Sequence, residues 1–550
     1  MNPGEPDYNL LDEPWIPVLL TDGSVEAVGI RGAFERSTQI VDLACELPTQ
    51  NAAVLRLLLA ICYRVIPLPD MQAYVDLASG DFPVDRLLGR CEQWRDRFYL
   101  FGGAHPFLQA PTLHTAKNEV SGLEKIIADV PNGSQFFTTR NGAALERISP
   151  AEAALWLLHA MAYDPSGIRS GAVGDDSAKG GKGYPIGPSW VGQVGMVILR
   201  GETLDETLAL NLVPPDSGEL QGPPPWRTPC VWEDDDAPTA VRRDYVDEPA
   251  PIAISRILTW PSRRIRLVGD RSGVTGVVLA QGDKLGPQDM QRYEPMGLWR
   301  YSDPQSKKLK QNTYMPRLYQ AGRALWRSVP GMLPTVAKVK GYDGSMIDQF
   351  LNSATLEFMA HLSSANRGAM GRLRLEAVGV TYGPQNATIE DIYHDEVTLS
   401  VTLLSSARPE LGHLVDGSVS RTEEVSGIVA NLASNLARAA GASGDGAGDG
   451  DRERARERFY GAVDGPYRAW LAALDGDSDI EAARELWDDT LRGIATSVAR
   501  ELVEATPDTA YVGRKDRGAY INTGIAENYF GAALRKALPH LTSTTEGDSK

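Results

Sequence analysis

Few positions in the sequence have the residue types and spacing of an active site. Residues 181–187 have the pattern G-x-G-x-x-x-G, one residue longer than the fingerprint that binds dinucleotides, and no strand leads directly into them. His394, Asp395 and Glu396 offer a base and two carboxylates, but three adjacent side chains point in different directions. We therefore expect an exposed polar turn there and no catalysis. A cytoplasmic hydrolase or transferase that uses the Gly-rich loop and the His394 region is the alternative.

The cysteines and histidines do not have the spacing of a metal site. The four cysteines include no C-x-x-C pair, and the seven histidines include no H-E-x-x-H motif. We expect no disulfide framework, no bound metal and no cofactor.

Other residues are of the types that contact nucleic acids. Gln385 and Asn386 follow a Gly-Pro pair, which is typical of a polar surface turn. Lys284 lies in a short loop, from which a lysine can reach base-edge acceptors in a groove. Phe136 and Phe137 follow a turn, where aromatic rings can stack on an unpaired base. By spacing alone, a surface turn, a surface lysine and a pair of core anchors are the commoner interpretations.

The charge distribution limits how the chain could hold nucleic acid. The net charge is −17, which argues against a broad basic face that grips DNA unaided. One basic segment, residues 300–327, contains Lys307, Lys308 and Lys310 and is interleaved with aromatic residues. It fits a surface that follows phosphates and a solvated helix face equally well.

The hydropathy pattern is that of a globular protein without a membrane segment. Hydrophobic residues make up 42% of the chain, and no apolar run reaches the roughly 18 residues that a membrane span needs. The start has no basic region followed by an apolar one, so no signal peptide is indicated. We expect a cytoplasmic protein with no membrane partner.

The elements that would position these residues can be predicted from periodicity. Residues 49–66 indicate a buried helix, and Ser149 with Pro150 starts another, in which His159 is expected to be a satisfied core histidine. Residues 165–188 are rich in glycine and predict a loop. Residues 264–279 predict a hairpin.

The chain is too long for one small core, and its end is helical. Amphipathic stripes from residue 422 onward, with a capping box at Ser478 and Glu481, predict a four-helix bundle. The fold class is therefore expected to be α+β, with a large mixed N-terminal domain over residues 1–400 and the bundle over residues 401–545.

Several blocks occur in the order found in a known family. They are residues 9–18 (NLLDEPWIPV), 98–109, 123–127 (LEKII), the Gly-rich loop and 382–389 (YGPQNATI). Together they resemble the CasA family, the large subunit of the type I-E CRISPR Cascade surveillance complex. The helical C-terminal part is similar in kind to the family's four-helix bundle.

The resemblance implies recognition of the PAM, the short motif beside a DNA target, from the minor-groove side. The DNA-binding residues would be Gly167, Ser170, Gly171 and Ala172 in a glycine loop, Lys284 as a lysine finger, and Gln385 and Asn386 as a wedge that starts strand separation. Small residues would let the loop backbone approach the base pairs. The family pattern has Asn before Gln, and the reversed order here leaves open which side chain is the tip.

The resemblance also implies partners. Phe136 and Phe137 would contact the 5′ end of the guide RNA or neighbouring subunits. The partners would be guide RNA, the other Cascade subunits, double-stranded target DNA and a helicase-nuclease that docks on the large subunit. Some relatives carry a cysteine cluster before the lysine loop, but residues 268–273 contain none, so no zinc is expected. A scaffold subunit without DNA contacts of its own is a further alternative.

Overall fold

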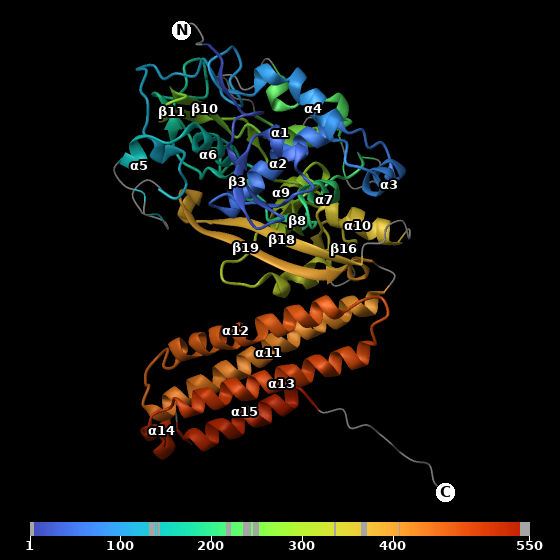
Figure 1. The fold of residues 1–550 in the computed structure, drawn as a ribbon. Coiled ribbons are helices and arrows are strands. Elements are labelled where there is room, and N and C mark those ends of the chain that lie inside the picture. Colours follow the sequence, from blue (N-terminus) through green and yellow to red (C-terminus); the bar gives the residue numbers. More distant parts are fainter. Residues whose placement is uncertain are drawn as a thin grey trace. The chain divides into compact units, whose positions relative to one another are not determined.

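The chain folds into two compact units. The computed structural model describes residues 5–130, 138, 140, 143–215, 220, 222–234, 244–245, 252–334, 337–364, 371–405, 408–516 and 518–539. Unit 1 consists of Met1–Arg323 and Ala337–Glu396, and unit 2 of Ala324–Val336 and Val397–Lys550. Unit 1 mixes helices with small sheets, whereas unit 2 is mainly helical (Figure 1). The expected α+β class is confirmed.

Unit 1 is built mainly from short elements, together with the longer helix α2 and the long strands β18 and β19. Its helices are α1 (Ile30–Glu35), α2 (Pro48–Val65), α3 (Met71–Ser79), α4 (Val84–Gln93), α5 (Ala143–Glu146), α6 (Pro150–Tyr163), α7 (Leu204–Leu210), α8 (Ile254–Ile257), α9 (Asp303–Leu309) and α10 (Ala354–Ser364). Its strands are β1 (Asp7–Asn9), β2 (Ile16–Leu20), β3 (Val25–Val28), β4 (Ile40–Leu43), β5 (Tyr99–Phe101), β6 (Arg169–Ser170), β7 (Lys182–Gly183), β8 (Met196–Arg200), β9 (Asp244–Tyr245), β10 (Arg263–Asp270), β11 (Gly273–Gln281), β12 (Lys284–Leu285), β13 (Trp299–Tyr301), β14 (Tyr314–Pro316), β15 (Lys338–Lys340), β16 (Met346–Asp348), β17 (Phe350–Leu351), β18 (Arg372–Tyr382) and β19 (Ile389–Ser400).

Helices α2 and α6 pack against each other in the core of unit 1, and both were predicted. The Ser149 hydroxyl accepts a hydrogen bond from the Glu152 N–H at 3.1 Å, and Pro150 opens α6, as expected for a capped helix start. His159 is buried, and its Nε2 lies 3.0 Å from Thr49 Oγ1. Burial lowers the pKa of His159 to about 4. The interpretation of His159 as a core histidine is confirmed.

A buried ion pair compensates the charge that Arg56 places inside α2. Arg56 interrupts the apolar run of this helix, and its two terminal nitrogens each lie 2.8 Å from a carboxylate oxygen of Glu294. Trp190 Nε1 donates to the same carboxylate at 2.8 Å. Both charged side chains are almost completely buried, so each needs the other to offset the cost of its desolvation.

Two antiparallel arrangements carry the candidate functional segments. Strands β10 and β11 form the predicted hairpin, with Arg263 opposite Gln281 at its open end and Asp270 opposite Gly273 at its turn. Strands β19, β18 and β8 form a sheet in that order. The long hairpin of β18 and β19 carries the segment with Gln385 and Asn386 in its turn.

The expected turn at residues 394–396 is wrong, because these residues lie within β19. His394 is exposed on the strand, and its Nε2 lies 3.0 Å from Glu376 Oε1 on the neighbouring β18. This hydrogen bond raises the pKa of His394. Tyr393 and Val397 on either side are buried, so the run of charged residues hides the alternation of a strand.

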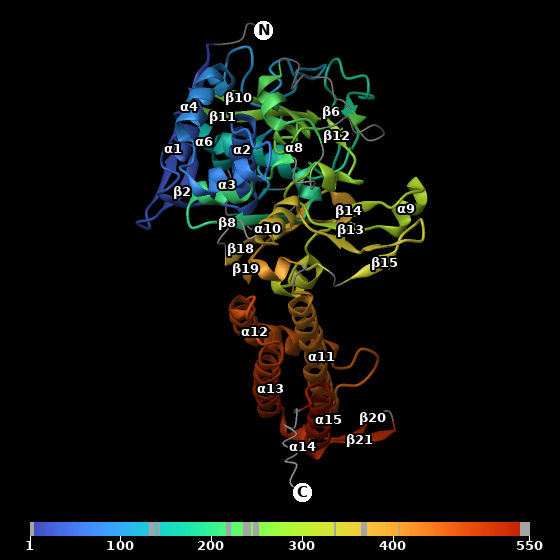
Figure 2. The ribbon, with the colours of Figure 1, turned by 90° about the vertical axis from the view of Figure 1, so that its right-hand side faces the viewer.

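Unit 2 contains the predicted helix bundle. Its helices are α11 (Pro409–Ala440), α12 (Asp449–Ala473), α13 (Ile480–Glu504), α14 (Asp508–Val512) and α15 (Thr523–Ala537), and its strands are β20 (Arg514–Asp516) and β21 (Ala519–Ile521) (Figure 2). The long helices α11, α12, α13 and α15 confirm the four-helix bundle. The cap of α13 is corrected: Asp479, and not Ser478, accepts the N–H groups of Glu481 and Ala482.

No helix in the described ranges is both long and apolar enough to cross a membrane.

Candidate nucleic-acid interface

The glycine-rich segment begins where α6 ends. Asp164 caps this helix, and its N–H donates to the Ala160 carbonyl at 3.2 Å. The chain then runs through β6, which pairs antiparallel with β7. The register places Arg169 opposite Gly183 and Ser170 opposite Lys182. The predicted loop is thus a small hairpin, whose first arm starts from a rigid helix end.

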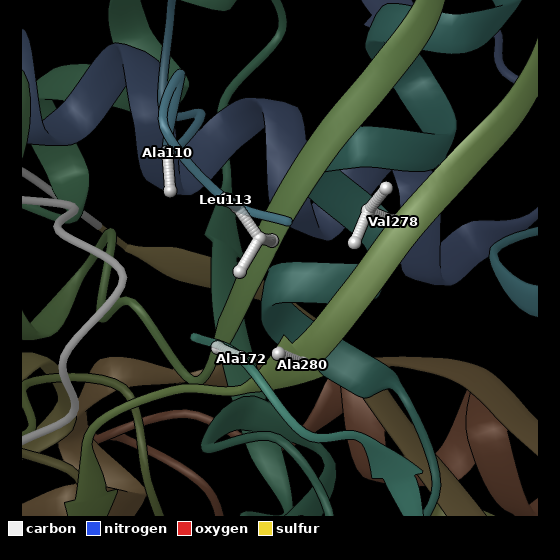
Figure 3. Packing of buried hydrophobic residues seen from close by; sticks show 5 residues of the cluster. All are labelled: Ala110, Leu113, Ala172, Val278 and Ala280. Carbon is white, nitrogen blue, oxygen red and sulfur yellow. The ribbon is translucent and has the colours of Figure 1, made fainter. Parts of the chain in front are cut away.

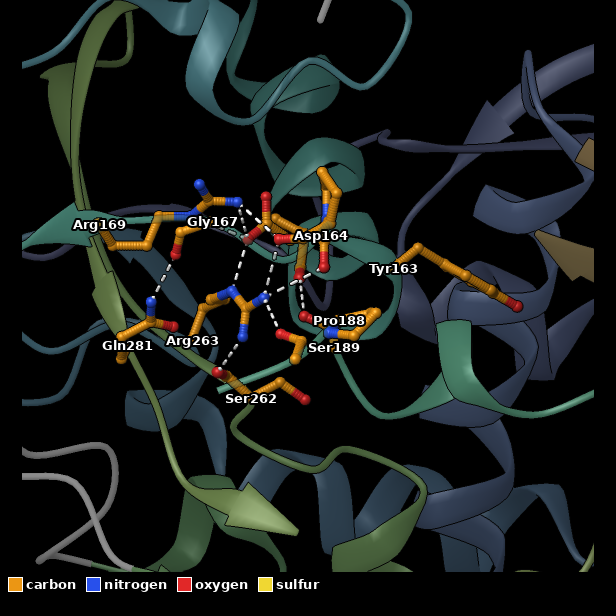
Figure 4. Close-up of polar contacts among 12 residues, drawn as sticks. Tyr163, Asp164, Gly167, Arg169, Pro188, Ser189, Ser262, Arg263 and Gln281 are labelled. Carbon is orange, nitrogen blue, oxygen red and sulfur yellow. Dashed lines mark hydrogen bonds and ion pairs between the residues drawn. The ribbon is translucent and has the colours of Figure 1, made fainter. Parts of the chain in front are cut away.

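A buried charge cluster holds the base of this hairpin (Figure 4). Arg263, which is 1% exposed, forms an ion pair with the Asp164 carboxylate. It also donates to the backbone carbonyl of Pro165 on the first arm at 3.0 Å and to that of Gly187 beyond the second arm at 2.9 Å. Burial lowers the pKa of Arg263, and the Asp164 charge opposes that shift. One guanidinium thereby fixes both ends of the glycine-rich segment.

The turn with Gln385 and Asn386 has a strained backbone. The segment Pro384–Asn386 is a single helical turn in which Gln385 and Asn386 have φ values of 59° and 56°. Residues other than glycine rarely adopt this left-handed conformation, and they persist in it only where the surroundings enforce it. Both side chains are exposed. The turn therefore presents two amide side chains to solvent on a defined backbone.

Two hydrogen bonds fasten this turn to the end of α6. The Ser166 N–H donates to the Asn386 carbonyl at 2.8 Å. The hydroxyl of Tyr382, the last residue of β18, donates to the Tyr163 carbonyl at 2.7 Å. Burial raises the pKa of Tyr382 well above its usual value, so the hydroxyl keeps its proton. The turn and the glycine hairpin are consequently parts of one local structure.

Gln281 connects the segment that contains Lys284 to the glycine hairpin. The Gln281 side-chain amide donates to the Gly167 carbonyl at 2.8 Å and to the Gly183 carbonyl at 3.3 Å, one on each arm of the hairpin. Lys284 follows three residues later in β12 and is half-buried. Because each residue spans at most about 3.6 Å, the Lys284 backbone lies within about 11 Å of the Gln281 backbone.

Gly171 and Ala172 face the protein. A Cβ added at Gly171 would lie 2.6 Å from the carbonyl carbon of Gly181, so the second arm of the hairpin fills the space beside it. Ala172 is buried in a cluster with Ala110, Leu113, Val278 and Ala280 (Figure 3). The exposed part of this arm is at Ile168, which is 55% exposed. The small residues at 171 and 172 therefore serve close packing, and their contact with DNA stays a prediction.

A small cavity lies beside the turn and the first arm of the glycine hairpin. Its volume is about 60 Å³. The residues that line it are Glu124, Lys125, Ile126, Ile127, Ala128, His159, Ala160, Asp164, Pro165, Arg169, Ala387 and Ile389. The segment 123–127 thus meets both elements. Phe136 and Phe137, a few residues further along, lie outside the described residues.

Several aromatic rings in and just before the basic segment 300–327 pack inside the protein. Trp299 and Trp326 are buried, and Tyr319 stacks on Tyr393 at 4.6 Å between ring centroids. Lys308 on α9 and Lys310 directly after it are exposed. Tyr301 and Tyr314 are half-buried and meet edge to face at 6.1 Å between ring centroids. The segment therefore has exposed cations beside rings that pack on one another.

The features required for the alternative enzyme do not come together. No group of three or more His, Cys, Asp or Glu residues within the described ranges could hold a metal ion. The segment 181–187 is followed by the single 3-10 turn Val191–Gln193 and then by β8, so no α-helix offers its N-terminus to a phosphate there. No hydrogen bond or ion pair within the described ranges links His394 to the glycine hairpin.

Several residues that organise this region escaped prediction. Asp164, Arg263 and Gln281 act through contacts between segments far apart in the sequence. Arg169 pairs with Asp164 only five residues away, and no motif marks the role of any of the four. Only Tyr382 had a signal, since it opens the segment that resembles the family pattern.

Comparisons with known proteins agree with the resemblance. The family model of CRISPR-associated protein Cse1 matches residues 9–498. The CRISPR-associated protein CasA/Cse1 of Thermus thermophilus is 28% identical over 508 residues, covering 89% of this chain and 91% of that protein. The crystal structure of Thermobifida fusca Cse1 superimposes with a TM-score of 0.88 at 38% identity, over 97% of this chain and 98% of that one.

A chain in a structure called CRISPR RNA-guided surveillance complex shares the fold, with a TM-score of 0.63 at 18% identity, over 90% of this chain and 99% of that one. The family model covers most of the sequence. The chain therefore belongs to the CRISPR-associated protein Cse1 (CasA) family.

Proposed function

We propose that this chain is the non-catalytic DNA-recognition subunit of an RNA-guided antiviral complex, where it reads the PAM and starts to unwind the target duplex. The observation that carries the proposal is the joining of the three candidate elements. Ser166 holds the turn of Gln385 and Asn386, and Gln281 ties the adjacent Gly167 to the strand that leads to Lys284.

The turn has the properties that a wedge needs. Unstacking one base step costs a few kcal/mol, so an inserted side chain must be held by a rigid surrounding structure. Gln385 and Asn386 stand at the end of a long hairpin, and Ser166 and Tyr382 fix that end. Amide side chains are also able to exchange hydrogen bonds with base edges. The side chains rather than the backbone of this turn would enter the duplex.

The glycine hairpin and Lys284 would read the motif next to the wedge. Gly167, Ser170, Gly171 and Ala172 are the proposed contacts of the hairpin arm, and Lys284 would offer its ammonium group to acceptors of the minor groove. In the minor groove the pattern of acceptors separates mainly A·T from G·C pairs, so a backbone and one lysine suffice for a coarse selection. Coarse selection of this kind is sufficient for a short motif.

The net charge of the chain fits a DNA-recognition subunit whose affinity for DNA depends on its partners. With a net charge of −17, affinity for DNA would come from the guide RNA and from basic subunits of the complex. Phe136 and Phe137 would contact the guide RNA or a neighbouring subunit. A helicase-nuclease would dock on this chain once the duplex is open. The CRISPR RNA-guided surveillance complex, which contains a chain of this fold, supports assembly of this kind.

Binding of target duplex by the guide-loaded complex tests the proposal. The complex is assembled with and without this subunit, and duplexes carry either the intact or a scrambled flanking motif. We expect the subunit to tighten binding only when the motif is intact. Binding that is blind to the motif, with normal assembly of the complex, would instead favour a scaffold role.

A further inference from the structure

Arg169 is a rigidly held arginine on the first arm of the glycine hairpin. Its Nε and Nη2 atoms lie 3.1 Å and 2.7 Å from Asp164 Oδ2, and Nη2 also donates to the Pro165 carbonyl at 2.7 Å. Its side chain is only 11% exposed. One edge of the guanidinium is therefore used to fix the side chain, which removes most of its rotational freedom.

The remaining nitrogen of Arg169 is left for another acceptor. Within the part of the chain that the structure describes, Nη1 has no hydrogen-bond acceptor, and in Figure 4 it points away from the Asp164 cluster. A Cβ added at Gly167 would lie 2.7 Å from Nη1. The glycine at this position thus makes room for the guanidinium.

The local charge balance favours an anion at this point. Asp164 is paired with both Arg169 and Arg263, so one carboxylate faces two guanidinium groups. The further contacts of Arg263 are backbone carbonyls, which do not neutralise it. The neighbouring cavity adds Glu124 and Lys125, one charge of each sign. The cluster therefore keeps an excess positive charge on a strongly acidic chain.

We propose that Arg169 binds a backbone phosphate of the DNA duplex beside the PAM, and that Asp164 and Arg263 are positioning residues that aim it. A single nitrogen with two N–H groups suits a phosphate oxygen, whereas base reading by arginine uses both nitrogens of the fork. Phosphate contacts set the register of a protein on the duplex without reading sequence. Arg169 would hold the duplex so that the glycine hairpin and the wedge meet the correct base steps. This inference rests on the proposed function.

The first test is the salt dependence of duplex binding by the complete guide-loaded complex. Replacing Arg169→Gln should weaken binding about tenfold and lower the slope of log affinity against log salt by about 0.9, the value for one phosphate. The loss should be equal for intact and scrambled motifs. Arg169→Lys keeps the charge and should retain most of the slope.

Arg147→Gln is the matched control. Arg147 is an exposed arginine whose Nη1 donates to Ser272 Oγ at 3.0 Å, at the turn of the β10–β11 hairpin and thus at the opposite end from Gln281. The same change of charge there should leave the slope unchanged. An Arg169→Gln slope equal to that of the wild type would overturn the inference.

A second measurement changes the DNA as well as the protein, so each protein is compared with itself and differences in folding stability between the variants do not affect the result. Single phosphates beside the motif are replaced by neutral methylphosphonates, and the affinity of each duplex is measured with the wild-type complex and with Arg169→Lys or Arg169→Gln. At one phosphate position, the methylphosphonate should lower the affinity of the wild-type complex for the duplex, whereas the affinity of the Arg169→Gln complex should not change. If no position distinguishes the proteins while the wild type still reads the motif, only the role of Arg169 falls. If the wild type is blind to the motif, the proposed function itself falls.

Discussion

The backbone N–H of Ser166 donates a hydrogen bond to the backbone carbonyl of Asn386 at 2.8 Å. This contact joins the first arm of the glycine hairpin to the turn of the β18–β19 hairpin. Because both partners are backbone atoms, the contact survives a change of the side chains at 385 and 386. The side chains can therefore be removed without detaching the turn, which makes their role separable from the architecture.

Tyr382→Phe should loosen the turn without altering its sequence. The change removes the hydroxyl that donates to the Tyr163 carbonyl at 2.7 Å and should cost about 1–3 kcal/mol of stability. Opening of linear duplex by the assembled complex should weaken. Tyr314→Phe is the control, because it also removes a hydroxyl that donates to a backbone carbonyl at 2.8 Å, that of Asp348, away from the turn. Equal opening by both variants would show that Tyr382 does not support the wedge.

Lys284→Ala should reduce discrimination between motifs. A lysine that contacts base edges contributes about 1–3 kcal/mol of preference, so the affinity ratio of intact to scrambled motif should fall about tenfold. Lys117→Ala, at an exposed lysine of unit 1, should leave the ratio unchanged. Binding assays with both duplexes give the ratio. A uniform loss on both duplexes would mean that Lys284 contacts phosphate and does not read the motif.

The buried His159 should make unit 1 less stable in mild acid. Its pKa is about 4 in the folded chain, below the ordinary value of about 6.5, so the unfolded chain binds the proton first as the pH falls. The stabilisation that comes from the neutral, buried His159 is complete above pH ~6.5 and is lost progressively as the pH falls towards 4. The free energy of unfolding should fall by about 3 kcal/mol over this range. Denaturant unfolding at several pH values measures this loss. In His159→Gln this part of the pH dependence should vanish, and parallel pH curves for the two proteins would refute the assignment.

Local patterns predicted the elements, whereas long-range contacts decide the site. The helix around Leu55 and the capped start at Ser149 follow from spacing and from one side-chain acceptor, and both are present. The Asp164–Arg263 pair joins residues 99 apart in sequence, and the Tyr382–Tyr163 contact joins residues 219 apart. Such pairs leave no periodic or local signal. The candidate DNA-contacting residues could therefore be predicted from the sequence, whereas the residues that hold them in place could not.

The wrong prediction at residues 394–396 has a physical origin. His394 lies in a strand between the buried residues Tyr393 and Val397, and its charged neighbours suggested a turn where register determines a strand. The structural reason is the partner strand, which a single segment does not reveal. The packing beside Gly171 also depends on a partner segment, because the second hairpin arm occupies the space beside it.

The wedge is tested by removing its side chains without straining its backbone. Gln385→Gly with Asn386→Gly suits the φ values of 59° and 56°, which glycine adopts freely, whereas alanine would add strain. Asn118→Gly is the matched control, since Asn118 is exposed and has a φ of 52°.

The decisive measurement is the fluorescence of 2-aminopurine placed at the first base pair beside the motif, in a linear duplex and in one pre-melted at that step. We predict that the double glycine variant opens and binds the linear duplex at least tenfold more weakly than the wild type or Asn118→Gly, yet binds the pre-melted duplex equally well. Equal losses on both duplexes, or no loss on either, would contradict the claim that Gln385 and Asn386 open DNA.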